Sequence, residues 1–230
     1  YGYLNNRMKN VLVESWHMEF LRIFGQGKFD SLIQFEGYNC FWTGLFASQN
    51  NKKRLIFMHN SMIEEYGEKY AYLRLVFWYC GWVNKVISVS KLTRDLNRKE
   101  LSERFDINKD KFEFCDNVQN QKYVLDRAKE PLAEEDAELF NGKTTFINIG
   151  RLSIEKDQIK LIKSFYEVYK EYKNCQLLII GEGMLKQNLI ELVNQLNLKG
   201  VVFILGSRSN PYNILSKSDC FVLSSNHEGQ

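Results

Sequence analysis

The chain has 230 residues, of which 44% are hydrophobic and 26% are charged, a profile typical of a globular protein with a substantial core. Its formal net charge of +3 is too small to indicate nucleic-acid binding. The five cysteines occur singly, without a Cys-x-x-Cys pair, which favours a reducing cytosol over a disulfide framework or a zinc site.

No apolar run reaches the roughly 18 residues that a membrane-spanning helix needs. The longest, from Leu73 to Val83, is shorter and is interrupted by Arg74. The chain starts with Tyr1 and lacks the pattern of a signal peptide, so we expect a cytoplasmic protein. Because Tyr1 is not a methionine and Gln230 falls inside a motif, we expect this sequence to be a fragment that lacks both ends of the functional unit.

In the first half of the chain, short apolar runs alternate with stretches of helical period. Strands are expected over Ser31–Phe35, Arg54–Met58, Lys85–Val89 and Lys111–Cys115. A long amphipathic stretch covers Glu64–Trp82, and a helix is expected over Lys91–Phe105. Strands that alternate with helices predict a parallel sheet that helices cover on both faces.

The segment from Gln119 to Lys143 differs in character from the rest of the chain. It is rich in charge, contains Pro131 and carries the acidic run Glu134-Glu135-Asp136. Runs of charge usually mark a solvated surface. We therefore expect a solvated helical linker over residues 119–143, between one domain over residues 1–118 and another over residues 144–230.

The second half repeats the alternation of strands and helices. Strands are expected over Thr145–Ile149, Leu177–Ile180, Val201–Leu205 and Phe221–Leu223. Helical periodicity covers Lys156–Tyr172 and Leu185–Leu196, and Asn210 is placed to cap a further helix with Pro211 at its first position. This is a doubly wound α/β pattern, in which ligands bind beyond the carboxyl ends of the strands.

The first strand of this half is followed by a segment suited to bind an anion. Gly150 lets a ligand approach the backbone closely, and Arg151 and Lys156 add two positive charges near the start of the next helix. This combination suits a diphosphate, whose negative charge grows as it leaves. The alternative is that both are ordinary surface cations beside Glu155 and Asp157.

Two further loops follow the next two strands. The glycines of Gly181-Glu182-Gly183 keep side chains away from the ligand, although a plain strand-to-helix turn explains a lone Gly-x-Gly at least as well. The small polar loop with Ser207 and Arg208 could recognise the edge of a base through backbone groups. The alternative is a loop that only caps the following helix.

The last strand is followed by Glu228, Gly229 and Gln230. The Glu228 carboxylate could accept hydrogen bonds from sugar hydroxyls while the next two amides face a phosphate, and the alternative is a surface glutamate. In the first half, His59 directly follows a strand and could bond a sugar hydroxyl or the developing oxocarbenium region. A lone histidine is otherwise more often structural.

Taken together, these segments resemble glycosyltransferase family four, because the matching blocks occur in the family's order and at suitable spacing. In the second half the blocks are Phe146–Ser153 with Lys156, Leu178–Gly183, Val202–Gly206, Asn210–Tyr212, Ser218–Ser225 and His227–Gly229. In the first half they are Ile56–Asn60, Val86–Lys91 and Asp110–Lys111 with Asn117. The sequence departs from the family at Asn117-Val118, where Asn-Pro is usual, and in lacking a visible glycine-rich loop in the first half.

The resemblance implies the GT-B fold, an α/β architecture of two Rossmann-like, doubly wound parallel-sheet domains, both incomplete in this chain. Residues 1–118 would be part of the acceptor-side domain. Residues 144–230 would be part of the domain that binds the nucleotide-sugar donor. A site shared by two such domains implies closure when the donor binds.

The resemblance also assigns roles to individual residues. Arg151 and Lys156 would bind the donor diphosphate, and His59 would lie near the donor sugar. Glu228 would be the first of two paired glutamates, the second lying beyond the end of this sequence. The nucleobase would meet the backbone around residues 207–208.

The implied activity is that of a retaining glycosyltransferase, which moves a hexose from a nucleotide sugar to an acceptor hydroxyl. We expect UDP as the nucleotide and a cell-envelope glycan or a polyol phosphate such as wall teichoic acid as the acceptor. No Asp-x-Asp motif and no His/Cys cluster with metal spacing occurs in the sequence. We therefore expect a reaction without a metal and without a cofactor other than the donor.

Two alternatives stay open at this point. An epimerase or phosphorylase acting on nucleotide sugars could use the same architecture, and a two-lobed module could bind sugar nucleotides without catalysis. The expected partners are the nucleotide sugar and its acceptor, with a peripheral contact to the inner membrane surface left open for the stretch from Arg74 to Trp82. The fragment is expected to be inactive by itself.

Overall fold

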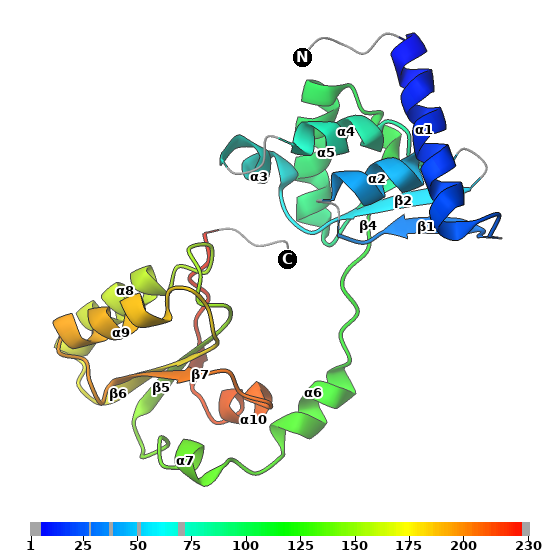
Figure 1. Cartoon of the computed structure of the whole chain (residues 1–230). Coiled ribbons are helices and arrows are strands. Elements are labelled where there is room, and N and C mark those ends of the chain that lie inside the picture. The colour runs from blue at the N-terminus through cyan, green and yellow to red at the C-terminus, as the bar shows by residue number, and fades with distance from the viewer. Residues whose placement is uncertain (1–5, 28, 37–38, 50–51, 69–71, 227–230) are drawn as a thin grey trace. The chain divides into compact units, whose positions relative to one another are not determined.

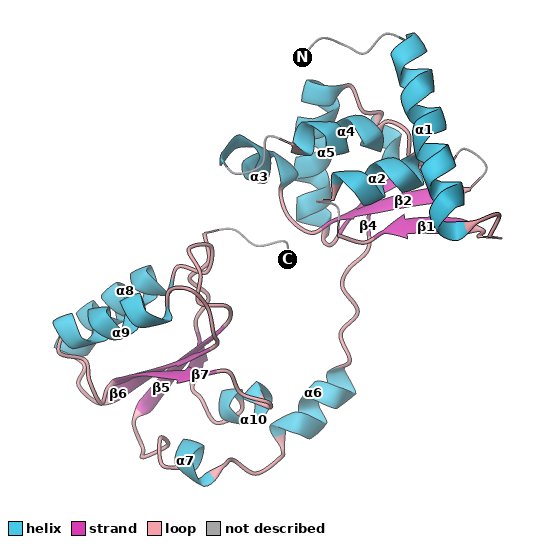
Figure 2. Ribbon diagram, in the orientation of Figure 1, coloured by secondary structure: helices cyan, strands magenta, loops and turns pink. Residues whose placement is uncertain are grey.

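The computed structural model describes residues 6–27, 29–36, 39–49, 52–68 and 72–226. The chain divides into two compact units, which we call unit 1 (up to Val118) and unit 2 (Gln119–Glu228). Each unit contains a parallel sheet with helices packed against it (Figures 1 and 2). The α/β class predicted from the sequence is therefore confirmed.

Unit 1 holds a four-stranded parallel sheet in the order β1-β2-β3-β4. The strands are β1 (Ser31–Gln34), β2 (Lys53–Met58), β3 (Lys85–Ser88) and β4 (Phe112–Phe114). The helices are α1 (Asn6–Phe24), α2 (Cys40–Ala47), α3 (Met62–Glu68), α4 (Leu73–Cys80), α5 (Lys91–Phe105) and the short 3-10 turn η1 (Lys109–Lys111). All four strands lie within one or two residues of the ranges that the sequence predicts.

Three features of unit 1 differ from the expectations. The stretch Glu64–Trp82 divides into α3 and α4 and does not form one long element. The helix α1 was not predicted, although Leu12, Trp16, Phe20 and Phe24 recur every four residues and pack against the cores beneath it. On β1, Leu32 is buried, whereas Ile33 is 52% exposed. Among the described residues, the prediction that helices cover both faces of the sheet therefore does not hold at this strand.

Unit 2 holds a second four-stranded parallel sheet, in the order β7-β6-β5-β8. The strands are β5 (Thr144–Ile149), β6 (Cys175–Ile180), β7 (Val202–Gly206) and β8 (Cys220–Phe221). The helices are α6 (Gln121–Ala128), α7 (Glu134–Ala137), α8 (Gln158–Glu171), α9 (Lys186–Gln195) and α10 (Pro211–Leu215). The chain adds β6 and β7 on one side of β5 and then returns to add β8 on the other side.

The strand β6 of unit 2 is buried on both faces of the sheet. Along β6, Leu177 and Ile179 belong to the core that α8 and α9 cover, whereas Leu178 and Ile180 belong to the core on the opposite face. Successive side chains of a strand point to opposite faces, so a continuous apolar run is what a strand between two layers requires. Figure 1 shows α8 and α9 together on one side of this sheet and α10 on the other.

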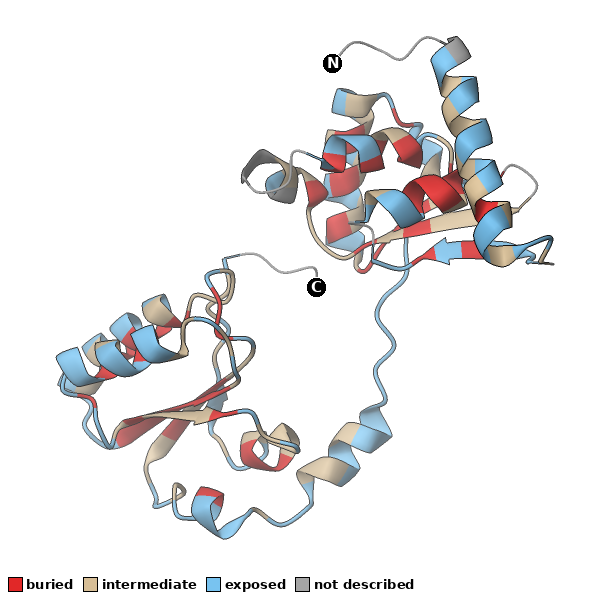
Figure 3. Cartoon of the chain, viewed as in Figure 1, coloured by how far each residue is buried: buried red, intermediate tan, exposed pale blue. Residues whose placement is uncertain are grey.

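The segment over residues 119–143 contains the helices α6 and α7 and is mostly exposed, and it clusters with unit 2. Leu132, Leu139 and Phe140 pack against the core on the α10 side of the sheet, and the acidic run contributes a buried Asp136. Residues 113–120, most of which come before this segment, are all exposed, and Val118 is 98% exposed (Figure 3). Residues 121–143 therefore belong structurally to unit 2.

Among the described residues, no helix combines the length and the apolar content needed to cross a lipid bilayer.

Candidate functional site

The strand order of unit 2 predicts where a ligand binds. The order β7-β6-β5-β8 places a reversal of direction between β5 and β8. In open parallel sheets of this type, ligands bind beyond the carboxyl ends of the strands at the point where the order reverses. The loops that follow β5 and β8 carry most of the residues that the sequence singles out, so we call this edge of the sheet the candidate site.

The loop after β5 brings Gly150 and Lys156 together. A Cβ on Gly150 would lie 3.8 Å from the Cγ and Cδ atoms of Lys156, so the aliphatic part of the lysine passes over the glycine. Leu152 is fully buried and anchors the loop in the core, while Arg151 is exposed. The helix α8 begins at Gln158, two residues later than predicted, so Lys156 lies in the loop and not in the helix.

A buried polar chain fixes the backbone of this loop. The fully buried Gln158 donates from Nε2 to the Arg151 carbonyl oxygen at 3.0 Å and to Asn148 Oδ1 at 3.4 Å. Asn148, also buried, donates to the Val222 carbonyl oxygen at 2.8 Å. The position of the Arg151 backbone is thus tied through two amides to the strand that leads into the loop after β8.

The loop after β8 lies directly against the loop after β5. Ser224 Oγ donates to the Lys156 carbonyl oxygen at 2.7 Å, and the Asn226 backbone N–H donates to the Glu155 carbonyl oxygen at 2.9 Å. The predicted residues Glu228, Gly229 and Gln230 lie outside the described residues, so their prediction stays untested.

The loop after β6 needs its glycines for close backbone packing. A Cβ on Gly181 would lie 1.9 Å from the Gly150 carbonyl oxygen, and a Cβ on Gly183 would lie 2.2 Å from the Leu152 carbonyl oxygen. The backbones are also hydrogen-bonded, since the Leu152 N–H donates to the Glu182 carbonyl oxygen at 3.0 Å. Gly183 was singled out as a donor-binding residue, and the structure gives it a definite task in holding the neighbouring loop.

Glu182 and Lys186 were missed as candidate residues. The Glu182 carboxylate accepts from Lys186 Nζ at 2.8 Å. The bond from Lys186 is the main reason that the pKa of the Glu182 carboxyl lies below its ordinary value. Gly206 makes this possible, because a Cβ there would lie 2.8 Å from Glu182 Oε1. No sequence spacing links residue 182 to residue 206, so only the fold could show this close approach.

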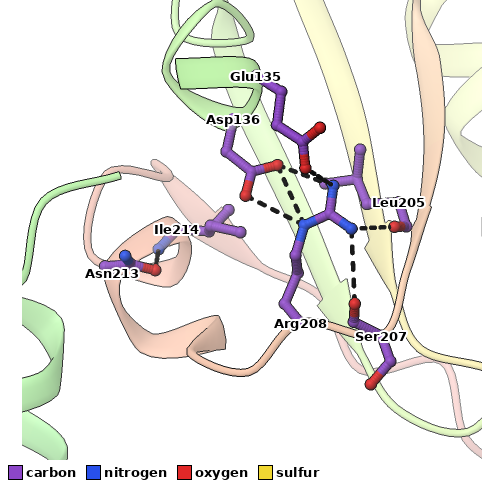
Figure 4. Close-up of polar contacts among 7 residues, drawn as sticks. All are labelled: Glu135, Asp136, Leu205, Ser207, Arg208, Asn213 and Ile214. Atoms are coloured by element: carbon purple, nitrogen blue, oxygen red, sulfur yellow. Dashed lines mark hydrogen bonds and ion pairs between the residues drawn. The ribbon is translucent and has the colours of Figure 1, made fainter. Parts of the chain in front are cut away.

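The Arg208 side chain is committed to the protein itself, as Figure 4 shows. Its Nε lies 3.0 Å from Asp136 Oδ2 and its Nη2 lies 2.9 Å from Asp136 Oδ1, while Glu135 is 3.4 Å away. The remaining nitrogen donates to the Leu205 carbonyl oxygen. These acidic partners raise the pKa of Arg208, with the bond to Asp136 as the largest cause. The guanidinium is therefore engaged within unit 2, and only the backbone of this residue is left as a ligand contact.

The same loop is bonded to the last turn of α6 and to Glu130 just after it. Arg127 Nη2 donates to the Ser209 carbonyl oxygen at 2.9 Å, and Asn210 Nδ2 donates to the Arg127 carbonyl oxygen at 2.8 Å and to Glu130 Oε2 at 2.9 Å. Asn210 also caps α10 as predicted, because its Oδ1 accepts from the Tyr212 N–H. The loop after β7 thus rests on residues 127–136.

In unit 1, His59 lies at the carboxyl end of β2, as the sequence predicts. Its Nε2 is 2.7 Å from the Phe35 carbonyl oxygen, and its ring meets the Phe35 ring edge to face at a centroid distance of 4.9 Å. A carbonyl only accepts, so Nε2 must carry a proton, which leaves Nδ1 as the ring nitrogen that could face a hydroxyl.

Asn97 of α5 was missed, although it holds the loop after His59. Its Oδ1 accepts from the Met62 N–H at 2.9 Å, and its Nδ2 donates to the Asn60 carbonyl oxygen at 3.0 Å and to Ser88 Oγ at 3.2 Å. Its exposed fraction is 1%. The signal was present in the sequence, because Asn97 falls midway between Thr93 and Leu101 on the buried face of α5.

Comparison with known proteins identifies the second half of the chain. Residues 129–230 match the family model of glycosyl transferases group 1. The chain is 35% identical over 185 residues to an uncharacterized glycosyltransferase of Methanocaldococcus jannaschii, a match that covers 80% of this chain and 45% of the relative. It is 31% identical over 133 residues, 58% of this chain and 34% of the relative, to the N-acetylgalactosamine-N,N'-diacetylbacillosaminyl-diphospho-undecaprenol 4-alpha-N-acetylgalactosaminyltransferase of Campylobacter jejuni. The chain thus spans less than half the length of these relatives.

Similar solved structures identify the fold. A mutant of Staphylococcus aureus TarM, solved with fondaparinux, alpha-GlcNAc-glycerol and UDP, matches with a TM-score of 0.65 at 18% identity, over 95% of this chain and 41% of that protein. Anabaena HepE in complex with UDP matches with a TM-score of 0.64 at 14% identity, over 95% of this chain and 57% of that protein. The predicted GT-B fold is confirmed: the chain contains two four-stranded parallel sheets of the kind found in these glycosyltransferases.

Proposed function

We propose that the whole protein transfers a hexose from a nucleotide sugar to an acceptor hydroxyl. The proposal starts from the glycosyl transferases group 1 domain that residues 129–230 carry. One observation carries the proposal. At the reversal between β5 and β8, Gly150 and Arg151 share a loop with Lys156, whose stem crosses back over Gly150. Two cations at that point suit the diphosphate of such a donor.

In the proposed reaction the bond between the sugar C1 and the diphosphate oxygen breaks, and a bond forms between C1 and the acceptor oxygen on the same face. The acceptor proton passes to an oxygen of the leaving diphosphate. Arg151 and Lys156 offset the charge that accumulates on that leaving group. We propose that they do so without a metal ion and that no cofactor besides the donor takes part.

Two further assignments belong to the same proposal. His59 would contact the donor sugar through Nδ1, because its Nε2 is held by the Phe35 carbonyl oxygen. Glu228 would accept hydrogen bonds from sugar hydroxyls. We further propose that units 1 and 2 are the acceptor-side and donor-side domains.

The choice of UDP and of an envelope acceptor is supported by similar proteins. TarM and HepE were solved with UDP, and the Campylobacter jejuni relative acts on a diphospho-undecaprenol-linked sugar by its name. We therefore propose a UDP-hexose as the donor. We propose a glycan or polyol phosphate of the cell envelope as the acceptor, with retention of configuration at C1.

The test uses the full-length protein with Arg151→Ala and Lys156→Ala, and with Lys163→Ala as the matched control. Lys163 is an exposed lysine of α8, so its loss changes the net charge equally without touching the loop. Calorimetry with UDP should show affinity lowered about tenfold or more for each loop variant, since a hydrogen bond to a charged group contributes about 1.5–3 kcal/mol. The control should bind as the unmodified protein does.

The outcomes separate the alternatives. Tight UDP binding by a variant that carries both Arg151→Ala and Lys156→Ala contradicts the proposed diphosphate site. A strict requirement for Mg²⁺ or Mn²⁺ in turnover contradicts the metal-free reaction. Conversion of the nucleotide sugar without any acceptor would indicate an epimerase, and binding without turnover in any acceptor screen would indicate a binding module.

A further inference from the structure

The loop over residues 206–210 is held from outside at three consecutive residues. Arg127 donates to the Ser209 carbonyl oxygen. Asn210 donates to the Arg127 carbonyl oxygen. The third residue, Arg208, is held by the acidic run of α7, which lies far from it in the sequence.

The contact between Arg208 and Asp136 is the strongest of these attachments. Asp136 is only 4% exposed, and its two oxygens accept from two nitrogens of one guanidinium, at 3.0 and 2.9 Å. Paired bonds of this kind fix the orientation of both groups as well as their distance. The third nitrogen donates to the Leu205 carbonyl oxygen at the end of β7, so the guanidinium bridges α7 and the start of the loop (Figure 4).

The position of this loop along the edge of the sheet indicates which part of a bound nucleotide it contacts. It follows β7, which is two strands away from β5 in the sheet order. Neighbouring strands are about 4.8 Å apart, so the loop lies about 10 Å along the edge from the loop with Arg151 and Lys156, which is the scale of a ribose and a base. Its exposed backbone groups can distinguish one base edge from another only if they are held in fixed positions.

We propose that Arg208 is a positioning residue for nucleotide recognition, which holds the loop over residues 206–210 so that its backbone groups select the base. The proposal rests on the proposed function, because it takes the diphosphate to lie at Arg151 and Lys156. The guanidinium itself does not touch the nucleotide. Base selection therefore depends on Asp136, a residue of the segment before the sheet.

If Arg208 only stabilised the fold, its loss would leave nucleotide preference unchanged in any variant that still folds. Single and double variants of Arg208 and Asp136 distinguish this structural role from the positioning role. Arg208→Met alone leaves a buried carboxylate without its partner and is expected to reduce stability strongly. Arg208→Met combined with Asp136→Leu removes both charges, and such replacements of a buried pair are often neutral for stability. The double variant should therefore fold while the loop is no longer held. Arg208→Lys keeps the charge and loses the paired geometry.

The experiment measures binding of UDP, GDP, ADP and inorganic pyrophosphate to the full-length protein by calorimetry. In the double variant, affinity for UDP should fall about tenfold or more and the preference among the three nucleotides should narrow, because small displacements of a recognition group are costly. Affinity for pyrophosphate should not change. Arg208→Lys should show the same loss to a smaller extent. The matched control is Arg22→Met, which breaks an Arg–Glu pair with two bonds of 2.7 Å on α1.

Two results would overturn the proposal, and they differ in meaning. A folded double variant with unchanged nucleotide preference would show that Arg208 acts only on stability, while the proposed function would stand. An unmodified protein that binds pyrophosphate as tightly as any nucleotide would overturn the proposed function together with the positioning role.

Discussion

Single glycines decide how closely the strand-end loops of unit 2 can pack. Gly181 has a φ of 150° and lies against the Gly150 carbonyl, and Gly183 lies against the Leu152 carbonyl in the same way. The second contact involves backbone on both sides, so no flexible side chain can move away to make room. Because Gly181 and Gly183 have no side chain, the loop after β6 packs directly against the loop that carries Arg151.

Gly183→Ala should destabilise the protein by about 3 kcal/mol or more, because the added methyl group would overlap the Leu152 backbone. The control is Gly200→Ala, where φ is 78° and nothing lies within 4 Å of the added atom. There only the left-handed backbone conformation opposes the change, at about 1–2 kcal/mol. Urea unfolding of the two variants should show the larger loss for Gly183→Ala. Equal losses would mean that the loop after β6 can shift to make room.

At the scale of elements, two buried glutamines offer a comparison between the two ends of the sheet in unit 2. Gln158 donates to the Arg151 carbonyl oxygen at the carboxyl end. Gln176, at the amino end of β6, donates to the Leu139 carbonyl oxygen at 2.6 Å and to Thr145 Oγ1 at 2.9 Å. Both are at most 1% exposed, and among the described residues both have an Oε1 atom without a hydrogen-bond partner.

Gln158→Met and Gln176→Met should each lower the free energy of unfolding by about 1–3 kcal/mol, since each leaves a partly buried carbonyl without its donor. Only Gln158→Met should also weaken UDP binding, because only Gln158 fixes the backbone of Arg151. Chemical unfolding and calorimetry on the same samples measure the two effects. If UDP affinity falls equally in both variants, the loss reflects general destabilisation and the role of Gln158 is wrong.

The periodicity of apolar residues predicts the elements of this fold well where burial alone determines them. The helix α5 has the predicted bounds, and the strand β6 is found where the sequence shows a continuous apolar run. In residues 119–143 the charges outnumber Leu132, Leu139 and Phe140, so the pattern does not show that these three pack against the core of unit 2. A charge can also be buried when a distant partner such as Arg208 is available, and no local pattern reveals that partner.

The candidate site also contains residues that the sequence could predict and residues that it could not. The residues directly after strands could be predicted, because in a parallel sheet the carboxyl ends all meet at one edge. The supporting residues Glu182 and Asp136 could not be assigned, because each meets a segment that lies elsewhere in the sequence. Asn97 could have been noticed from its place on the buried face of α5, but the loop that it holds could not. The roles of the site residues stay predictions until binding is measured.

At the scale of the whole molecule, the connection between the two units is short and lies before α6. Residues 113–120 are exposed, and the described contacts of residues 121–143 are with unit 2. Exposed chain without packed backbone is where proteases cut first. The position of the first cut therefore distinguishes this short connection from the longer solvated linker that the charge pattern predicts.

Limited digestion with thermolysin, which cleaves before large apolar residues, should cut first before Val118, which is 98% exposed. Mass spectrometry of an early time point identifies the cut. Cuts before Val124 or Leu125 should come later, because both lie within the helix α6. A first cut within residues 121–143 would show that this segment is not held by unit 2.

The ion pair between Asp136 and Arg208 also limits how this protein can be recombined with its relatives. A chimaera joined near Lys143, where the sheet of unit 2 begins, would take Arg208 from one parent and residue 136 from the other. A guanidinium would then face a foreign side chain in a position built for a carboxylate. A junction at Val118 keeps the two partners in one piece, so the exchangeable module begins 25 residues before the strand that appears to start it.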